Sequence, residues 1–347
     1  MPTAFRFASY YLVLIVLLSS LTACGDKKQN DISRFFLRGR ALFQKKQYEE
    51  AIRLFGEAVR NDSTFAEAWN NMGAAKAKLG RTEAALVDYD RALRADSTLA
   101  DAYFNRSLAL YELERYPEAL QDLDHIARLR QDSVAFFLQR GTVLDKLAKP
   151  QQALDDFNRA VRLAPNAAEP YINRGTVYFS QKKWPEAQQD FRKALAIAPR
   201  QDFALNNLGL LLTQQGNYAE ALPLFDQAIG IQGKQPYYLN NRAFVKIQLK
   251  DLAGARADLD LSLYYDEQNP WALRNQGIWY LQSGQAGPAL EWLRKSQTAN
   301  PQTDDIHYYL GCAYLANQQK KEACQEWKLS LAQKERAKIA EMLPNCP

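Results

Sequence analysis

Apolar residues return along this chain in short helical blocks. In residues 168–201 they recur at spacings of three and four from Tyr171 to Phe179, and again from Ala187 to Leu195 after a Trp-Pro break. Spacings of three and four place side chains on one face of an α-helix, and the break marks a turn. This stretch therefore predicts two helices joined by a tight turn.

The same block repeats every 34 residues. A small residue, here called the node, marks each unit, and an alanine stands twelve residues after every node, from Ala51 to Ala323. A period of this length is the signature of a solenoid, whose stacked units bury a core that no single unit could bury. Because glycine inside a helix costs about 1 kcal/mol relative to alanine, we expect the alanine-bearing helix to pass too close to the node for a β-carbon. The nodes are Gly39, Gly73, Ser107, Gly141, Gly175, Gly209, Ala243, Gly277 and Gly311.

The pattern around the node resembles the tetratricopeptide repeat (TPR). A large residue stands sixteen residues after the node, as at Phe157 and Phe191, and a proline stands twenty-four after it, as at Pro165. The resemblance implies an all-α fold, a right-handed superhelical solenoid of nine helix-turn-helix units over residues 32–337, with a capping helix and tail in residues 335–347. It also implies an interaction scaffold rather than an enzyme, a role that the family fills in many unrelated systems.

An arginine directly before the node is paired with an aspartate fifteen residues after it in four units. In the sixth unit both members change together, to Leu208 and Leu224. This joint change predicts that the two positions touch and form ion pairs between the two helices of a unit. Because the pairs are spread regularly along the chain, they do not converge on a catalytic site. The four pairs are Arg106 with Asp122, Arg140 with Asp156, Arg174 with Asp190, and Arg242 with Asp258.

The first 23 residues have the features of a signal peptide. Arg6 precedes the apolar run Tyr10–Leu18, which is shorter than the roughly 20 residues that a membrane-spanning helix needs. The run ends in Leu-Thr-Ala-Cys, which resembles the bacterial lipoprotein signal and implies stable anchoring by acyl chains on Cys24; an ordinary secretory peptide is the alternative. Gly25 in place of aspartate after the cysteine favours the outer membrane, facing the periplasm. Residues 24–31 form the expected lipidated tether.

Charge narrows the choice of partner. Cleavage of the signal peptide removes one charged residue, Arg6, and lowers the formal charge from +5 to +4. Acids and bases alternate along the predicted helices, as expected for solvated faces and not for a nucleic-acid-binding stripe. We therefore expect protein or peptide partners, with the membrane contacted through the lipid anchor, and no nucleic acid or small-molecule substrate.

Two further positions of the 34-residue repeat suggest a binding groove. Asparagine recurs two residues before the node, a position that the resemblance places on the concave groove, where it can grip a peptide backbone; alternatively, asparagine is merely common there. Six residues before the node the chain is acidic in its first half and aromatic in its second half. Aromatic anchors favour a groove in units six to nine, unless the rings are buried by the superhelix or by a terminal cap. The candidate groove residues are Asn173, Asn207, Asn241, Asn275, Phe203, Tyr237, Trp271, Phe244, Ile278, Tyr308 and Tyr309.

Three cysteines remain once Cys24 carries lipid. A capping helix over residues 335–343 would bring Cys346 back beside Cys324, so a disulfide between these two is favoured, with Cys312–Cys324 as the rival pairing. No C-x-x-C motif occurs, and the spacing of His307 and the cysteines matches no zinc pattern. We expect no metal and no cofactor other than the acyl group.

Motifs for catalysis are missing from the sequence. It contains no G-x-S-x-G, G-x-x-x-x-G-K-[ST] or H-E-x-x-H. The favoured hypothesis is a membrane-anchored adaptor of the cell envelope that binds an extended segment or helix in its concave groove. A structural spacer or self-associating solenoid without a peptide ligand is the alternative, and a thiol-redox or other unrecognised enzyme is the weakest.

Overall fold

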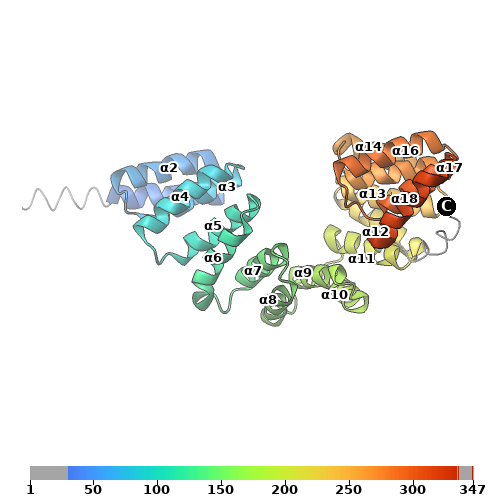
Figure 1. Ribbon diagram of the computed structural model, residues 1–347. Helices are drawn as coiled ribbons and strands as arrows, with labels where there is room; N and C mark the ends of the chain where they lie inside the picture. The colour runs from blue at the N-terminus through green and yellow to red at the C-terminus, as the bar shows by residue number, and fades with distance from the viewer. Residues whose placement is uncertain (1–29, 334, 336–345, 347) are drawn as a thin grey trace, which may run out of the picture. The chain divides into compact units, whose positions relative to one another are not determined.

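The computed structural model describes residues 30–333, 335 and 346. All regular structure in these residues is helical, and the chain divides into two compact units, Met1–Pro165 and Asn166–Pro347 (Figure 1). The predicted signal peptide, Cys24, the first part of the tether and all but the first residue of the predicted capping helix lie outside the described residues.

The first compact unit contains four helix-turn-helix repeats. Residues 30–44 are helical and pair with α2. The remaining elements are α2 (Tyr48–Asn61), α3 (Ala66–Lys78), α4 (Thr82–Ala95), α5 (Ala100–Glu112), α6 (Tyr116–Ile126), the 3-10 turn η1 (Ala127–Leu129), α7 (Val134–Lys146) and α8 (Pro150–Leu163).

The second compact unit contains five further helix-turn-helix repeats, so the described residues hold the nine repeats that the 34-residue period predicts. The predicted all-α fold of nine helix-turn-helix units is confirmed. Its elements are α9 (Ala168–Ser180), α10 (Trp184–Ile197), α11 (Asp202–Gln214), α12 (Tyr218–Ile231), α13 (Pro236–Gln248), α14 (Leu252–Tyr265), α15 (Pro270–Gln282), α16 (Ala286–Ala299), α17 (Ile306–Ala316) and α18 (Lys320–Ala332).

The turn inside every pair contains one residue with positive φ, always seven residues after the node. The angle ranges from 54° at Ala148 to 80° at Gly216, and glycine fills the position in only three units. The left-handed conformation costs an L-residue roughly 1 kcal/mol or more, so the remaining six units sustain a strained turn. The regularity of the turn comes from the packing of the two helices rather than from glycine.

A ring, not an alanine, explains most of the node glycines. A β-carbon added at Gly141 would lie 2.6 Å from the ring of Phe157, and one at Gly209 would lie 2.8 Å from that of Phe225. The expectation that the alanine-bearing helix passes too close for a β-carbon is therefore confirmed, but the nearest atoms belong to the large residue sixteen positions after the node and not to the alanine. Where the node has a β-carbon, the ring is replaced by leucine, as in the pairs Ser107 with Leu123 and Ala243 with Leu259.

The predicted arginine–aspartate pairs form in all four units. In the fourth unit, for example, Arg140 donates from Nε and Nη2 to the two carboxylate oxygens of Asp156, at 2.8 and 2.7 Å. The same guanidinium also reaches Asp124 of the preceding unit, at 3.5 Å. Arg140 thus links successive repeats as well as the two helices of one repeat, and Arg106 and Arg242 make the equivalent double contact.

The second 34-residue repeat has the aspartate of the ion pair but not the arginine. Asp88 is fully buried, Met72 stands before the node, and Lys76 supplies the positive charge instead. Burial raises the pKa of the Asp88 carboxyl, and the Lys76 ammonium opposes this rise. The lattice aspartate is therefore kept within reach of a cation even where the arginine is lost.

Candidate partner-binding surface

Three aromatic residues of the second compact unit occupy equivalent positions on the first helices of three successive helix pairs, and we call them the aromatic stripe: Phe203, Tyr237 and Trp271. Each is the second residue of its helix, on α11, α13 and α15. Phe203 is 58% exposed and Tyr237 is 47% exposed, whereas Trp271 is half-buried. Large aromatic side chains exposed in register across neighbouring helices are typical of a partner-binding surface.

Local sequence holds the stripe in place. Pro236 and Pro270 begin α13 and α15, where the fixed φ of proline suits the first helical residue. The rings of Tyr237 and Trp271 meet edge to face with their centroids 6.1 Å apart, and the indole N–H of Trp271 donates to the Asp304 carboxylate at 3.3 Å. Tyr237 and Trp271 therefore hold each other and the Asp304 carboxylate in place, and side chains held in this way lose less freedom when a partner binds.

The start of the stripe is supported by a buried tyrosine. The ring of Phe203 packs edge to face on Tyr238, with centroids 6.3 Å apart. The hydroxyl of Tyr238 donates to the Asp202 carboxylate at 3.0 Å. Burial raises the pKa of Tyr238 above its ordinary range, and the neighbouring carboxylate raises it further, so the hydroxyl keeps its proton and its hydrogen bond.

Several of the asparagines two residues before the node form hydrogen bonds with the preceding repeat. The side-chain amide of Asn241 donates to the Oδ1 atom of Asn206 in the preceding unit at 2.8 Å, and that of Asn275 donates to Asn240 at 2.7 Å. Asn275 is fully buried. In the first compact unit of the chain, the side-chain amide of Asn105 donates in the same way to the Oδ1 atom of Asn70, at 3.0 Å.

Asn207 is also engaged, because its amide donates to the Thr176 hydroxyl at 3.3 Å, and Asn173 is half-buried. The prediction that these asparagines grip a peptide is corrected for Asn275, which is fully buried and bonded to the preceding repeat. Asn241 is half-buried, and its part in peptide binding stays a prediction. A buried amide without its partner would be costly, and this explains why asparagine occurs in pairs at these neighbouring positions.

Four other candidate residues belong mainly to the core. Ile278 and Tyr309 are buried in the hydrophobic cluster of the last three units, and Phe244 and Tyr308 are half-buried against it. Their assignment to an open groove is therefore corrected for Ile278 and Tyr309. Ile278 on α15 and Tyr309 on α17 pack into one cluster with the buried residues of α16 and α18.

Buried Arg274 is a feature that the sequence analysis missed. Its Nη1 atom donates to the backbone oxygen of Asp304 at 2.7 Å, and its guanidinium lies 5.7 Å from the centroid of the Phe244 ring. Arg274 therefore fixes the loop that carries Asp304, the acceptor for Trp271. The position three residues before the node follows no fixed pattern and is asparagine in only three repeats, at Asn70, Asn206 and Asn240, so the sequence contains no signal for the contacts of Arg274.

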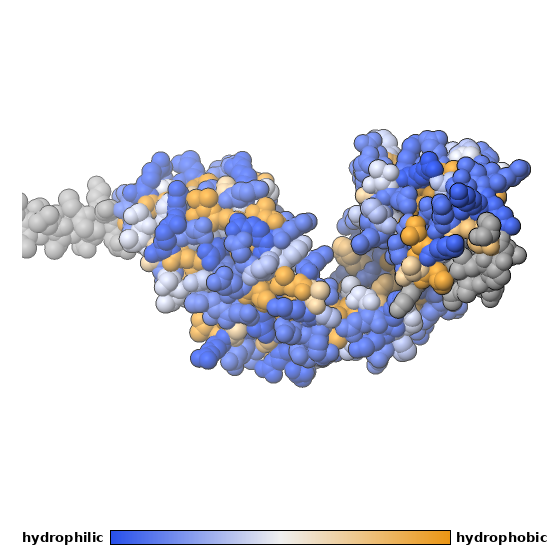
Figure 2. All heavy atoms as spheres, in the orientation of Figure 1, coloured by the Kyte–Doolittle hydropathy of each residue, from blue (hydrophilic) through white to orange (hydrophobic). Residues whose placement is uncertain are grey.

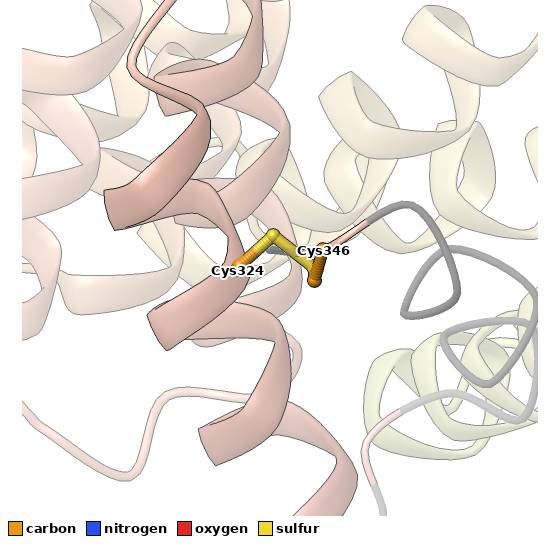
Figure 3. Close-up of a disulfide and its surroundings, with 2 residues drawn as sticks. All are labelled: Cys324 and Cys346. Carbon is orange, nitrogen blue, oxygen red and sulfur yellow. A yellow bond between two sulfur atoms is a disulfide. The ribbon is translucent and has the colours of Figure 1, made fainter.

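The cysteines lie at the end of the second unit. Cys324 of α18 and Cys346 form a disulfide, with their Cα atoms 5.6 Å apart (Figure 3). Cys312 is half-buried on α17. The carboxylate of Glu335 accepts hydrogen bonds from the backbone N–H groups of His307 and Tyr308, at 3.3 and 2.9 Å, and so caps the start of α17.

Elsewhere on the described surface, we find no cluster of side chains that indicates a metal site or a membrane span. Figure 2 shows mostly hydrophilic residues on the visible face, with apolar residues in small patches between them. Within residues 30–333, 335 and 346, no group of three or more His, Cys, Asp and Glu side chains is arranged to hold a metal ion. The same residues contain no helix that is both long enough and apolar enough to span a membrane.

Comparison with known families agrees with the helix pairs. Models described as tetratricopeptide repeat match residues 166–234 and 66–99, and one described as TPR repeat matches residues 39–80. The chain is a tetratricopeptide-repeat protein. TPR proteins are protein-interaction scaffolds and generally binders rather than enzymes, so the coarse function follows from the repeats.

Solved structures show the same fold at low sequence identity. The chain is similar to the APC/C hetero-tetramer Cut9–Hcn1, with a TM-score of 0.64 and 14% identity over 90% of this chain and 76% of that one. It is also similar to PilW, a widely conserved type IV pilus biogenesis factor, with a TM-score of 0.51 and 21% identity over 60% of this chain and 98% of that one. No curated protein matches the TPR chain by sequence.

Proposed function

We propose that this TPR protein is a lipid-anchored adaptor of the bacterial cell envelope, and that its second unit binds an extended segment or helix of a partner protein on the aromatic stripe. The observation that carries the proposal is the exposure of Phe203 and Tyr237 at equivalent positions of neighbouring helices. Exposed rings held in place by their own helices are the anchors that dominate binding energy at protein interfaces. A row of them suits a partner that runs across the helices.

The envelope assignment rests on the lipoprotein-like signal ending at Cys24 and on the three later cysteines. Disulfides persist in oxidising compartments, and the Cys324–Cys346 bond fits one. The proposed location is the periplasmic face of the outer membrane, because Gly25 follows the lipidated cysteine. The partner is an envelope protein.

Removal of the two exposed rings should abolish partner binding while leaving the fold intact. The test places a photo-crosslinking residue at Gln201, directly before α11, identifies the crosslinked envelope protein, and measures binding of the crosslinked segment as a synthetic peptide. Phe203→Ser with Tyr237→Ser should weaken that binding at least 100-fold, since two anchor residues each contribute about 2 kcal/mol or more.

The matched control is Leu261→Ser with Tyr264→Ser, two exposed apolar residues on α14 of the same unit. It should bind the peptide within twofold of the unsubstituted protein, and both variants should keep the same helical content. Equal binding by the stripe variant would reject the stripe as the site. It would place the partner elsewhere on the chain, whereas failure to crosslink any envelope protein would favour the second candidate, a structural spacer, for which the asparagine links between repeats are the supporting observation.

Replacement of Cys24 by alanine should release the protein from the membrane. Loss of the acylated cysteine removes two or three acyl chains, which together give stable anchoring. Fractionation of cells should then find the protein in the soluble envelope fraction or, if processing fails, as an uncleaved precursor of higher mass. Processed protein that still sediments with membranes and resists high salt would contradict the lipid anchor.

A further inference from the structure

The first arginine of the lattice differs from all the complete pairs. Arg38 stands directly before the first node, but Leu54 occupies the position of the paired aspartate, and no unit precedes it among the described residues to supply the second carboxylate. In the complete pairs the arginine side chain is at most 24% exposed. Arg38 is exposed and forms no ion pair among the described residues, so its charge is available to an outside partner.

Other cations share a helix face with Arg38. Arg34, Arg38 and Ala41 follow one another at spacings of three or four, Leu37 lies three residues after Arg34 and four before Ala41, and Lys45 continues the row in the turn directly after the helix; all five are exposed. Leu37 is 60% exposed. One acid lies near this face, Asp31, and it pairs with Arg34 at 3.0 Å on the surface. We call Arg34, Leu37, Arg38, Ala41 and Lys45 the basic face.

The charge of the chain is concentrated around this face. Residues 24–47 contain seven Lys and Arg against two Asp, a net charge of +5, whereas residues 48–347 carry a net charge of −1. The alternation of acids and bases expected along the whole chain therefore has one exception, at the end nearest Cys24. A local excess of this size points to a polyanionic partner.

We propose that the basic face docks on anionic phospholipid headgroups of the membrane that holds the protein. The inference rests on the proposed anchor at Cys24, from which six residues lead to residue 30, a reach of at most about 20 Å. Lipidation thus holds the face close to the headgroups. Electrostatic attraction acts within a Debye length, about 8–10 Å at physiological salt, and each basic residue near an anionic surface adds to it. Leu37 supplies an apolar contact at the headgroup boundary.

Vesicle binding by the unlipidated mature chain tests the basic face separately from the anchor. The mature chain with Cys24→Ser, produced without its signal peptide, is sedimented with vesicles of 30% phosphatidylglycerol in phosphatidylcholine, or of phosphatidylcholine alone. We expect binding to the anionic vesicles only, and its loss in 0.5 M NaCl. Substituting Arg34, Arg38 and Lys45 by glutamine should lower the partition coefficient roughly 100-fold, at about fivefold for each charge.

The control removes three exposed basic residues elsewhere, Arg162, Lys193 and Lys234, also by glutamine substitution. It should bind within a few-fold of the unsubstituted chain, because only the site differs and not the net charge. Equal binding by the two triple variants, or equal binding to neutral vesicles, would overturn the proposal. Failure of the anchor would appear instead in the fractionation of the Cys24→Ala protein, so the two results are distinguishable.

Discussion

Replacement of Arg140 by leucine is expected to lower the free energy of unfolding by about 3 kcal/mol. The substitution removes both hydrogen bonds to Asp156, whose side chain is only 6% exposed. A carboxylate left buried without its cation costs about 3–5 kcal/mol, and the value falls toward the lower limit because Arg140 itself is 22% exposed. Urea denaturation followed by circular dichroism measures the change.

The chain itself supplies the compensating variant. Leucine replaces both members of the pair in the sixth unit, at Leu208 and Leu224, so Arg140→Leu with Asp156→Leu should recover most of the stability. A buried ion pair replaced by apolar residues of similar volume is often neutral. A double variant as unstable as the single one would contradict the account.

An exposed pair serves as the matched control. Arg115 and Glu118 are separated by 2.6 Å, but both side chains are about half exposed. Replacing Arg115 by leucine should therefore leave the free energy of unfolding nearly unchanged, because solvent screens an exposed ion pair. The difference between the two arginines isolates burial, because both make close contacts with a carboxylate.

Comparison among the chain's own units made these ion pairs predictable. Leu208 and Leu224 together replace the arginine and the aspartate that four other repeats pair, and this joint change indicates contact in the way that an alignment of relatives would. The helix pairs and their boundaries follow for the same reason, since nine copies of one pattern reinforce each other. Periodicity therefore predicts contacts that recur.

Periodicity is less informative about which atoms touch. The alanine twelve residues after the node and the large residue sixteen after it are equally regular, yet at Gly141 and Gly209 the ring is the nearest neighbour of the missing β-carbon. The sequence pattern cannot rank the two because both lie on the same helix. Side-chain volume was the neglected signal, because Ser107 and Ala243 occur only with leucine.

Burial is the property that the lattice predicts least well. Trp271 and Asn275 both lie near the start of α15, but the first is half-buried and the second is fully buried. The difference depends on the asparagine of the preceding unit, Asn240, which accepts from Asn275. A candidate site predicted from positions within the repeat alone therefore mixes residues that face a partner with residues that join neighbouring repeats.

Loss of the Cys324–Cys346 disulfide is expected to destabilise the last helix pair by about 3 kcal/mol. The bond closes a loop over a sequence separation of 22 residues, and the chain-entropy model gives this value for such a loop. Glu335 lies within that loop and caps α17 at His307 and Tyr308. Opening of the loop should therefore weaken the cap as well as the tie to α18.

The effect should be local, because each unit of a repeat protein contacts only its neighbours. In the variant with Cys324→Ser and Cys346→Ser, amide hydrogen exchange should accelerate roughly 100-fold in α17 and α18 and stay unchanged in α11. Reduction of the unsubstituted protein should reproduce this pattern, whereas Cys312→Ser should not, because Cys312 lies outside the bond. Unchanged exchange in α17 and α18 would mean that the helix pair is held by its apolar core alone, and exchange accelerated equally across the second unit would mean that the unit unfolds as a whole.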